Sequence, residues 1–286
     1  MLAEELLQSG QLPEALADLQ QHIRREPGNP KYRVFLFQLL SVLGDWDRAS
    51  AQLEVAGQLD AGTLLMVQMY REALRCEFFR REVFAGHRTP LLFGEPAEWL
   101  ALLVESFRLT SLGESAQGSA LRERAFDAAP ATAGVITLAD ESTHSFEWLA
   151  DADPRFGPVL EVVLQAKYYW IPVARISKID FEPPTDLRDF VWAAAHFVWT
   201  NGGEAIGLIP ARYSGSESHV DPQVRLGRKT DWVDQPDDLS VGVGQRMLAT
   251  DVGEFALLDI RSITFHSADE SSSSDAVTPV GEEPHG

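Results

Sequence analysis

The sequence predicts an α+β fold, in which an N-terminal tetratricopeptide-like helical domain is followed by a small, mainly β domain. Two observations predict it. Residues 1–130 carry apolar side chains at helical spacing and contain an internal repeat, whereas residues 131–266 consist of short β-branched and aromatic runs separated by Gly and Pro. Many short strands with frequent turns are typical of a small barrel or a strongly bent sheet. We expect residues 267–286, which are acidic and of low complexity, to form a disordered tail.

The first domain is expected to be helical because its apolar residues recur every three or four positions and the breaks fall at Pro and Gly. In the first helix, Leu12, Ala15, Leu19 and Ile23 share one face, and the pattern stops at Pro27. The expected helices span residues 11–26, 32–43, 46–59, 63–84, 96–112 and 119–128.

An internal repeat supports this assignment. The stretch from Gly10 to Ala15 aligns with the stretch from Gly44 to Ala49 at an offset of 34 residues. This offset is the tetratricopeptide period, and a small residue five positions after Gly lets two packed helices approach closely. Two such units are visible, so we interpret residues 1–130 as a tetratricopeptide-like domain.

The second domain is expected to be built from strands because β-branched and aromatic residues alternate with turn residues. A single helical turn is expected at residues 186–190, and a long polar loop at residues 214–239. The expected strands span residues 135–138, 145–149, 160–164, 168–171, 176–181, 245–249 and 254–265, together with the two strands of the hairpin described next.

Asn201-Gly202 is the strongest hairpin signal in the chain. Both residues tolerate the positive φ of a two-residue type I′ turn, and Gly203 follows directly. The second strand leads to Arg212 and Tyr213, and then to the long loop, a place where side chains are presented to a partner. The register expected from this turn pairs Trp199 with Glu204, Phe197 with Ile206 and Ala195 with Leu208.

Composition limits the classes of function. The formal net charge of −19 argues against nucleic-acid binding and allows a basic protein partner, although a solubilising surface charge explains it equally well. No window approaches the 18 apolar residues of a membrane span, and the first ten residues are acidic where a signal peptide is basic. A single cysteine, Cys76, excludes an internal disulfide, fits a reducing compartment and is expected to lie buried on a helix.

Motifs for catalysis, metals or cofactors are missing from the sequence. It has no CxxC, no HExxH and no phosphate-binding loop of the P-loop type, so we expect neither a metal nor a cofactor. One catalytic alternative stays open. Glu204, Asp231, Asp251 and Glu254 would support a carboxylate-dependent hydrolase if they met at one end of the β domain.

Basic residues near the long loop are the first candidates for partner binding, because base is scarce in this chain. Arg212, Arg225 and Arg228 either form ion pairs that fix the loop to the β domain or form a fork for a partner's carboxylate. Glu204 and Tyr213, at the two ends of the second hairpin strand, complete this set.

Aromatic residues form the second set of candidates. Trp199 and Trp232 belong either to the core or to an exposed groove. Tyr32, Phe35 and Trp46 either pack the helices together or line a helical groove for a peptide. Both interpretations remain open for each residue.

A set of motifs that occur in order along the chain carries a family resemblance. With these motifs, the chain resembles the ImpE family, also called SciE or TagJ, of accessory proteins of bacterial type VI secretion. The motifs are PGNP at 27–30, FLFQLLSVLGDW at 35–46, FEPPTDLRD at 181–189, WTNGGE at 199–204, PARY at 210–213, GSE at 215–217, RLGR at 225–228, TDW at 230–232, GQR at 244–246 and LLDIR at 257–261.

The resemblance implies a non-enzymatic, cytoplasmic bacterial protein. It implies binding to the N-terminal helix of the small subunit of the contractile sheath, and association with the AAA+ ATPase that disassembles the contracted sheath. Such binding would be of the helix-in-groove kind. The resemblance assigns no contact residues, so the two sets above remain candidates. The alternatives are the hydrolase and a general tetratricopeptide-like scaffold for peptides.

Overall fold

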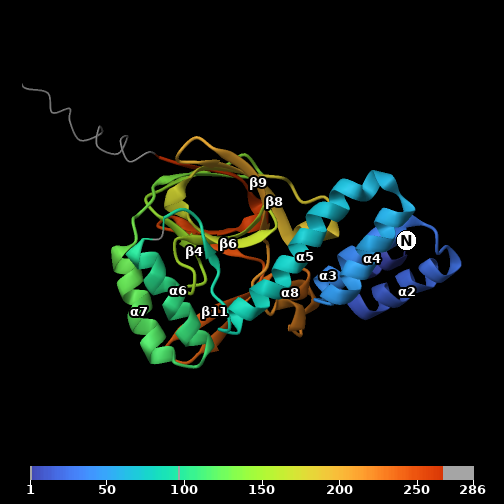
Figure 1. The fold of residues 1–286 in the computed structure, drawn as a ribbon, viewed down its shortest axis with the longest axis horizontal. Helices are drawn as coiled ribbons and strands as arrows, with labels where there is room; N and C mark the ends of the chain where they lie inside the picture. Colours follow the sequence, from blue (N-terminus) through green and yellow to red (C-terminus); the bar gives the residue numbers. More distant parts are fainter. Residues whose placement is uncertain (1, 96, 267–286) are drawn as a thin grey trace, which may run out of the picture.

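The fold is a row of helices followed by a bent β-sheet, as the sequence predicts (Figure 1). The structure is a computed structural model that describes residues 2–95 and 97–266. The tail expected at 267–286 lies outside the described residues. The helices are α1 (Leu2–Gln8), α2 (Leu12–Arg25), α3 (Pro30–Val42), α4 (Trp46–Leu59), α5 (Leu64–Phe84), α6 (Glu98–Ser111) and α7 (Ser115–Ala128).

Two helical hairpins, α1–α2 and α3–α4, form the two units of the internal repeat. Gly10 and Gly44 end the first helix of each unit with φ of +79° and +72°, the left-handed conformation that commonly closes a helix. Five residues later, Ala15 and Ala49 are fully buried. Helix α1 was not among the expected helices, because its 7 residues are too short to show a periodic pattern.

Helix α5 has 21 residues and is therefore about 31 Å long. It crosses the centre of the molecule from the α3–α4 hairpin towards the α6–α7 hairpin (Figure 1). After it, the chain forms β1 (Leu91–Leu92), which pairs in parallel with β6 (Lys167–Pro172). The expectation that residues 1–130 are helical throughout is wrong here, because Pro90 disfavours a helix and Gly94 takes a positive φ.

The described strands form three sheets. The largest has nine strands in the order β1–β6–β5–β9–β8–β7–β14–β2–β3, so it bends without closing into a barrel. The others pair β10 with β11, and β13 with β12 and β4. The strands not yet given are β2 (Gly134–Leu138), β3 (Thr143–Phe146), β4 (Leu149–Asp151), β5 (Val159–Leu164), β7 (Ile176–Phe181), β8 (Trp192–Trp199), β9 (Glu204–Pro210), β10 (Thr230–Gln235), β11 (Leu239–Gly244), β12 (Met247–Thr250), β13 (Gly253–Ala256) and β14 (Ile260–Phe265).

The register expected for the β8–β9 hairpin is wrong by one residue. Glu204 lies opposite Val198, not opposite Trp199. The backbone amide of Trp199 instead donates to the carbonyl of Gly203, so the loop has three residues, and its last residue, Gly202, has a φ of +81°. This is the alternative hairpin loop in which a left-handed residue follows a type I turn, and it moves every side chain of β9 to the other face.

Two further expectations are corrected. The strand expected at 145–149 is split, because β3 and β4 belong to different sheets. The loop expected at 214–239 is largely structured. It contains helix α8 (Pro222–Arg225), which starts where Asp221 accepts a hydrogen bond from the amide of Gln223 at 2.8 Å, and it ends in strand β10.

The buried apolar residues of the described part of the chain form two cores. One lies within the bend of the sheet. The other joins the helices to the outer face of the sheet, where Trp46 meets Trp192 with ring centroids 5.9 Å apart and Phe107 meets Trp170 at 5.0 Å. Cys76 is buried on α5, as expected. Among the described helices, none has both the length and the apolar character needed to cross a membrane.

Candidate functional site

A groove of about 580 Å³ lies where the repeat helices meet the β part. It runs between α1, α3 and the short helix η3 (Leu187–Phe190). The groove brings together Tyr32, Phe35 and Arg228, three residues from the two sets of sequence candidates. Its other apolar walls come from Leu7, Leu187 and Phe190.

Local sequence fixes the walls of this groove. Tyr32 and Phe35 are one turn apart on α3, so they share a face. Pro30 opens that helix, and the side chain of Asn29 caps it by accepting from the amide of Lys31 at 3.1 Å. On the opposite wall, a capping box built on Asp186 starts η3, which packs against α3.

Arg228 forms the third wall and is held in place by α1. Its Nη1 donates to the carbonyl oxygens of Leu7 at 3.1 Å and of Gln8 at 3.3 Å. These are the last carbonyls of α1, which have no partner within the helix. The groove therefore depends on a contact between residues more than two hundred positions apart.

Arg212 is directed inward, to α3. Its side chain is only 4% exposed. Nη1 donates to the carbonyl of Val42 at 3.0 Å and also to that of Arg225, and Nη2 donates to the carbonyl of Ser41 at 3.2 Å. Burial lowers the pKa of Arg212 to about 10. The guanidinium thus binds helix carbonyls inside the protein, where a partner's carboxylate does not reach it.

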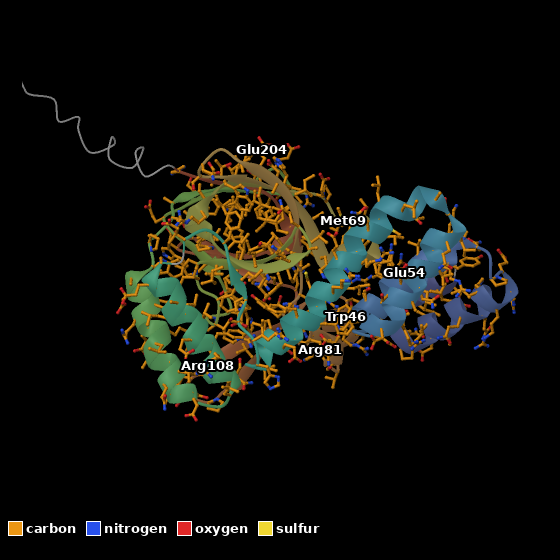
Figure 2. The ribbon with its side chains drawn as sticks, in the orientation of Figure 1. Trp46, Glu54, Met69, Arg81, Arg108 and Glu204 are labelled. Atoms are coloured by element: carbon orange, nitrogen blue, oxygen red, sulfur yellow. The ribbon has the colours of Figure 1, made fainter. Side chains whose placement is uncertain are left out.

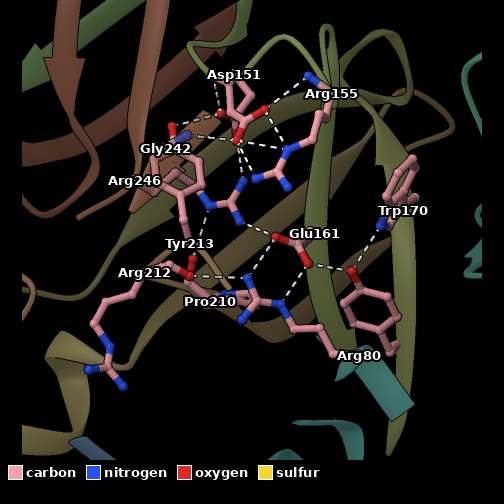
Figure 3. A network of polar contacts seen from close by, with 12 residues as sticks. Arg80, Asp151, Arg155, Glu161, Trp170, Pro210, Arg212, Tyr213, Gly242 and Arg246 are labelled. Carbon is pink, nitrogen blue, oxygen red and sulfur yellow. Dashed lines mark hydrogen bonds and ion pairs between the residues drawn. The ribbon is translucent and has the colours of Figure 1, made fainter. Parts of the chain in front are cut away.

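A buried polar network joins α5 to the sheet (Figure 3). Glu161 on β5 accepts a bidentate pair of hydrogen bonds from Arg80, at 2.7 Å and 2.9 Å. It also accepts from Arg246, which donates in turn to Asp151. A further bond, from Nη2 of Arg80 to the carbonyl of Arg212 at 3.1 Å, extends the network towards α3.

Tyrosine hydroxyls complete the network. Tyr168 donates to Glu161, and Tyr213 donates to Asp151 at 2.8 Å. Tyr213, a candidate for partner binding, is therefore inside the protein, where it is 1% exposed. Glu161 and Asp151 therefore each have both a guanidinium and a hydroxyl as partners, which compensates their burial.

Within this network the pKa values of Glu161 and Asp151 are shifted in opposite directions. Although burial opposes it, the guanidinium of Arg80, together with that of Arg246, lowers the pKa of Glu161 to about 2. For Asp151 burial prevails over the attraction of Arg246 and raises the pKa to about 6. Glu161 is consequently charged at any ordinary pH, while Asp151 titrates in mild acid.

Comparison with known proteins follows the same division of the chain. The family described as "ImpE protein" matches residues 143–264, and a tetratricopeptide repeat family matches residues 6–69. A Pseudomonas aeruginosa protein described as "Type VI secretion system accessory component TagJ" is 49% identical over 269 residues, which cover 94% of this chain and 92% of that protein. The chain belongs to the ImpE family.

A solved structure supports the fold of this ImpE-family chain. The crystal structure of a Vibrio parahaemolyticus protein from a structural genomics programme superposes with a TM-score of 0.82 at 25% identity, and covers 93% of this chain and 98% of that one. The ImpE match contains Arg212 and Arg228, and the repeat match contains the carbonyls of α1 and α3 that they bind. The groove therefore lies between the two matched regions.

The structure places Trp199 and Trp46 inside the ImpE-family fold. Trp199 stacks on Phe197 in the core of the bent sheet, with ring centroids 5.1 Å apart and planes 10° apart. Trp46 starts α4 and packs against Trp192 of β8. Neither tryptophan lines the groove.

The remaining candidates lie elsewhere on the surface. Trp232 on β10 is 37% exposed, and its ring is 6.1 Å from that of Tyr213. Glu204 is exposed at the start of β9, where it contacts Nε2 of His196 at 3.0 Å. Arg225 is half-buried on α8, and its carbonyl serves Arg212. Exposed Asn201, Gly202 and Gly203 form the β8–β9 turn.

The carboxylates of the hydrolase alternative lie in three different sheets. Glu204 starts β9 in the nine-stranded sheet, Asp231 lies in β10, and Asp251 and Glu254 flank the β12–β13 turn. Glu204 and Asp231 each contact a histidine of their own. In the described part of the chain, no group of His, Cys, Asp and Glu side chains could hold a metal ion. This geometry lends the hydrolase no support.

Apart from Tyr213, the residues of the buried network were not among the sequence candidates. Glu161 offers the clearest signal, because it is a carboxylate in an otherwise apolar strand, and a buried charge requires a partner. Its partner Arg80 lies on α5, and no local pattern connects the two. Leu187 and Phe190 were expected only as a helical turn and not as walls of a groove.

Proposed function

We propose that this protein is a non-enzymatic, cytoplasmic adaptor of a type VI secretion system. In this role its groove binds the N-terminal helix of the small subunit of the contractile sheath, and the bound complex assists the AAA+ ATPase that disassembles the sheath. The likeness to a type VI accessory component supports the general role. The groove between α1, α3 and η3 supports the mode of binding.

The groove suits an amphipathic helix because aromatic anchors and charged groups are close together in it. Tyr32, Phe35 and Phe190 offer apolar surface, while Lys31 and Asp186 offer charges of both signs at the rim. A helix presents apolar residues at positions i, i+3, i+4 and i+7 along one face, which is the pattern that grooves of this kind recognise. The backbone groups of such a helix bond within the helix, so its side chains alone determine how well it fits the groove.

Calorimetry with the full-length protein tests this function. The ligand is a synthetic peptide of the N-terminal helix of the small sheath subunit from the same genome. We expect a dissociation constant in the micromolar range or tighter. Phe35→Asp should raise it at least tenfold, whereas Phe78→Asp, at an exposed phenylalanine on α5, should leave it unchanged.

Two results would contradict the proposal. One is the absence of heat at several hundred micromolar peptide while circular dichroism shows an intact fold. The other is equal affinity for an unrelated amphipathic helix, which would favour the general peptide scaffold. The role with the ATPase is tested separately: addition of this protein should increase binding of the ATPase to sheath subunits, and Phe35→Asp should remove the increase.

A further inference from the structure

A second apolar groove lies between α5 and β9, on residues that the proposed function does not use. Its volume is about 420 Å³. Leu65 and Met69 form one wall from α5, and Ile206 forms the other from β9. These side chains are 84%, 41% and 67% exposed, which is unusual for large apolar residues that share one surface. Figure 2 labels Met69 on α5 and Glu204, which starts β9.

The backbone beside this groove has an open edge. Strand β5 pairs with β9 only where Val163 lies opposite Leu208. Just beyond, β5 ends at Leu164 and turns through Gln165 and Ala166, whose φ values are +49° and +62°. Because β5 ends here, β9 continues past this turn with β8 on one side and no paired strand on the other.

The register of the hairpin directs the free backbone groups outward. The carbonyl of Gly203 bonds to β8, and alternate residues of β9 bond to β8 in the same way. The amide and carbonyl of Ile206 therefore point away from β8, towards the groove. Outside the strand ladders, no backbone group in the described part of the chain bonds to them, and β5 pairs with β9 only at Val163 and Leu208. The edge offers one donor and one acceptor at the position of an exposed apolar side chain.

We propose that this groove binds an extended apolar segment of another protein, which adds to the edge of β9 as a short strand. Its amide and carbonyl groups pair with those of Ile206, and its side chains pack against Leu65 and Met69 of α5. This mode combines backbone bonds, which give affinity, with an apolar wall that selects the side chains. A bound helix would leave the edge of β9 unpaired, because helix backbone groups bond within the helix.

Charge selects the kind of segment. Glu72 is the charged residue that lines the groove, and Glu204 lies at the end of the open edge. A second copy of this chain would carry the same net charge of −19, so the two copies would repel each other. The segment that fits is therefore one with alternating apolar residues and flanking Lys or Arg, from a neutral or basic protein.

Amide hydrogen exchange of the full-length protein tests this site. The probe is the peptide acetyl-Lys-Val-Thr-Val-Thr-Val-Lys-amide at millimolar concentration. We expect exchange at the Ile206 amide to slow at least tenfold. Ile206→Asp should abolish this protection at the amide of residue 206, and Val220→Asp, at the 93% exposed valine of another loop, should keep it. Circular dichroism verifies that both variants fold.

Three results would overturn the proposal. The first is no change in exchange at Ile206 with millimolar probe. The second is a shift of the Leu65 methyl signals without protection of the edge, which indicates a helix or another occupant. The third is a concentration-dependent dimer in sedimentation that Ile206→Asp removes, because the occupant is then a second copy. Failure of the sheath peptide to bind would leave this inference untouched, since the two grooves share no lining residue.

Discussion

Arg212 and Arg228 bind equivalent positions of the two repeats. Arg228 donates to the carbonyls of residues 7 and 8, and Arg212 donates to those of residues 41 and 42. Each pair of carbonyls ends the first helix of its repeat, and the two pairs are separated by the repeat offset of 34 residues. The β part thus contacts both repeats in the same way.

Helix electrostatics explain the choice of arginine. The last carbonyls of a helix carry partial negative charge and lack partners within the helix, so a guanidinium both satisfies and stabilises them. Of the two interpretations of these arginines from the sequence, attachment of the loop region agrees with this geometry. The anchors, however, are backbone carbonyls and not carboxylates.

Replacement of Arg212 should destabilise the protein. Arg212→Ala removes several charge-assisted bonds from a buried site, and we expect it to lower the free energy of unfolding by about 3 kcal/mol. The free energy of unfolding of Arg212→Lys should lie between those of Arg212→Ala and the parent, since an ammonium group replaces only part of the hydrogen bonds of the guanidinium. Urea unfolding followed by circular dichroism measures both. Arg228→Ala should lower the free energy of unfolding by less, because Arg228 binds the end of α1 at an exposed position. An Arg212→Ala protein as stable as the parent, but weaker in peptide binding, would assign Arg212 to the partner site instead.

Replacement of Gly44, at the turn of the second repeat, should destabilise the protein more than replacement of Gly202 in the β8–β9 turn. Gly44 and Gly202 have similar positive φ, but a Cβ on Gly44 would lie 2.5 Å from Cγ of Glu217, whereas a Cβ on Gly202 meets open space. Gly202→Ala should cost about 1 kcal/mol from backbone strain alone. Gly44→Ala should cost about 1 kcal/mol more, because Glu217 must also move. Equal losses in urea unfolding would show that Glu217 moves away freely.

Replacement of Arg80 should lower the free energy of unfolding more when Glu161 is present than when Glu161 is also replaced by a neutral residue. Arg80→Met leaves Glu161 buried with Arg246 as its one remaining cation, and we expect a loss of about 4 kcal/mol. Adding Glu161→Gln should recover part of that loss, because the charge of Glu161 is then removed and only the ion pair of Arg80 with Glu77 stays broken. A double-mutant cycle measures the coupling, for which we expect about 2 kcal/mol. Additive losses would mean that the pair is not coupled.

Asp151 should give the stability a distinct pH dependence. Its pKa is raised from 3.8 to about 6, so the folded protein holds a proton between these values that the unfolded chain has lost. The contribution of Asp151 to the free energy of unfolding therefore falls as the pH rises from about 4 to 6, by up to about 3 kcal/mol.

Comparison with Asp151→Asn isolates this effect. The variant cannot titrate, so the difference in stability between parent and variant should change with pH across that window. Glu161 does not interfere, because its lowered pKa confines its own loss to pH below about 4.5. Parallel stability curves from pH 4 to 7 would refute the prediction.

Local patterns in the sequence predict much of this fold. The boundaries of α4 and β7 agree with expectation to the residue, since Gly44 and Pro183 mark clear breaks beside strong periodic patterns. The β8–β9 hairpin was found, but its register was not. Asn201-Gly202 fits both a two-residue and a three-residue loop, and only the packing of the sheet selects between them.

The groove is less predictable than the fold. Tyr32 and Phe35 stand out as aromatic residues one turn apart, and Arg228 as a base in an acidic chain. That these residues share one groove follows from the docking of α1 on the β part, which no local pattern encodes. The buried network is similar, since Arg80 and Glu161 are 81 positions apart in sequence.

The contacts of Arg212 and Arg228 also constrain the number of residues in each repeat. A residue gained or lost within α2 would leave the helical pattern intact, yet it would set one repeat out of step with its arginine while the other stayed in place. Ordinary solenoids grow by adding units to an open end. Here the two arginine contacts hold the ends of α1 and α3 at a fixed separation, so the β part constrains the number of residues between them.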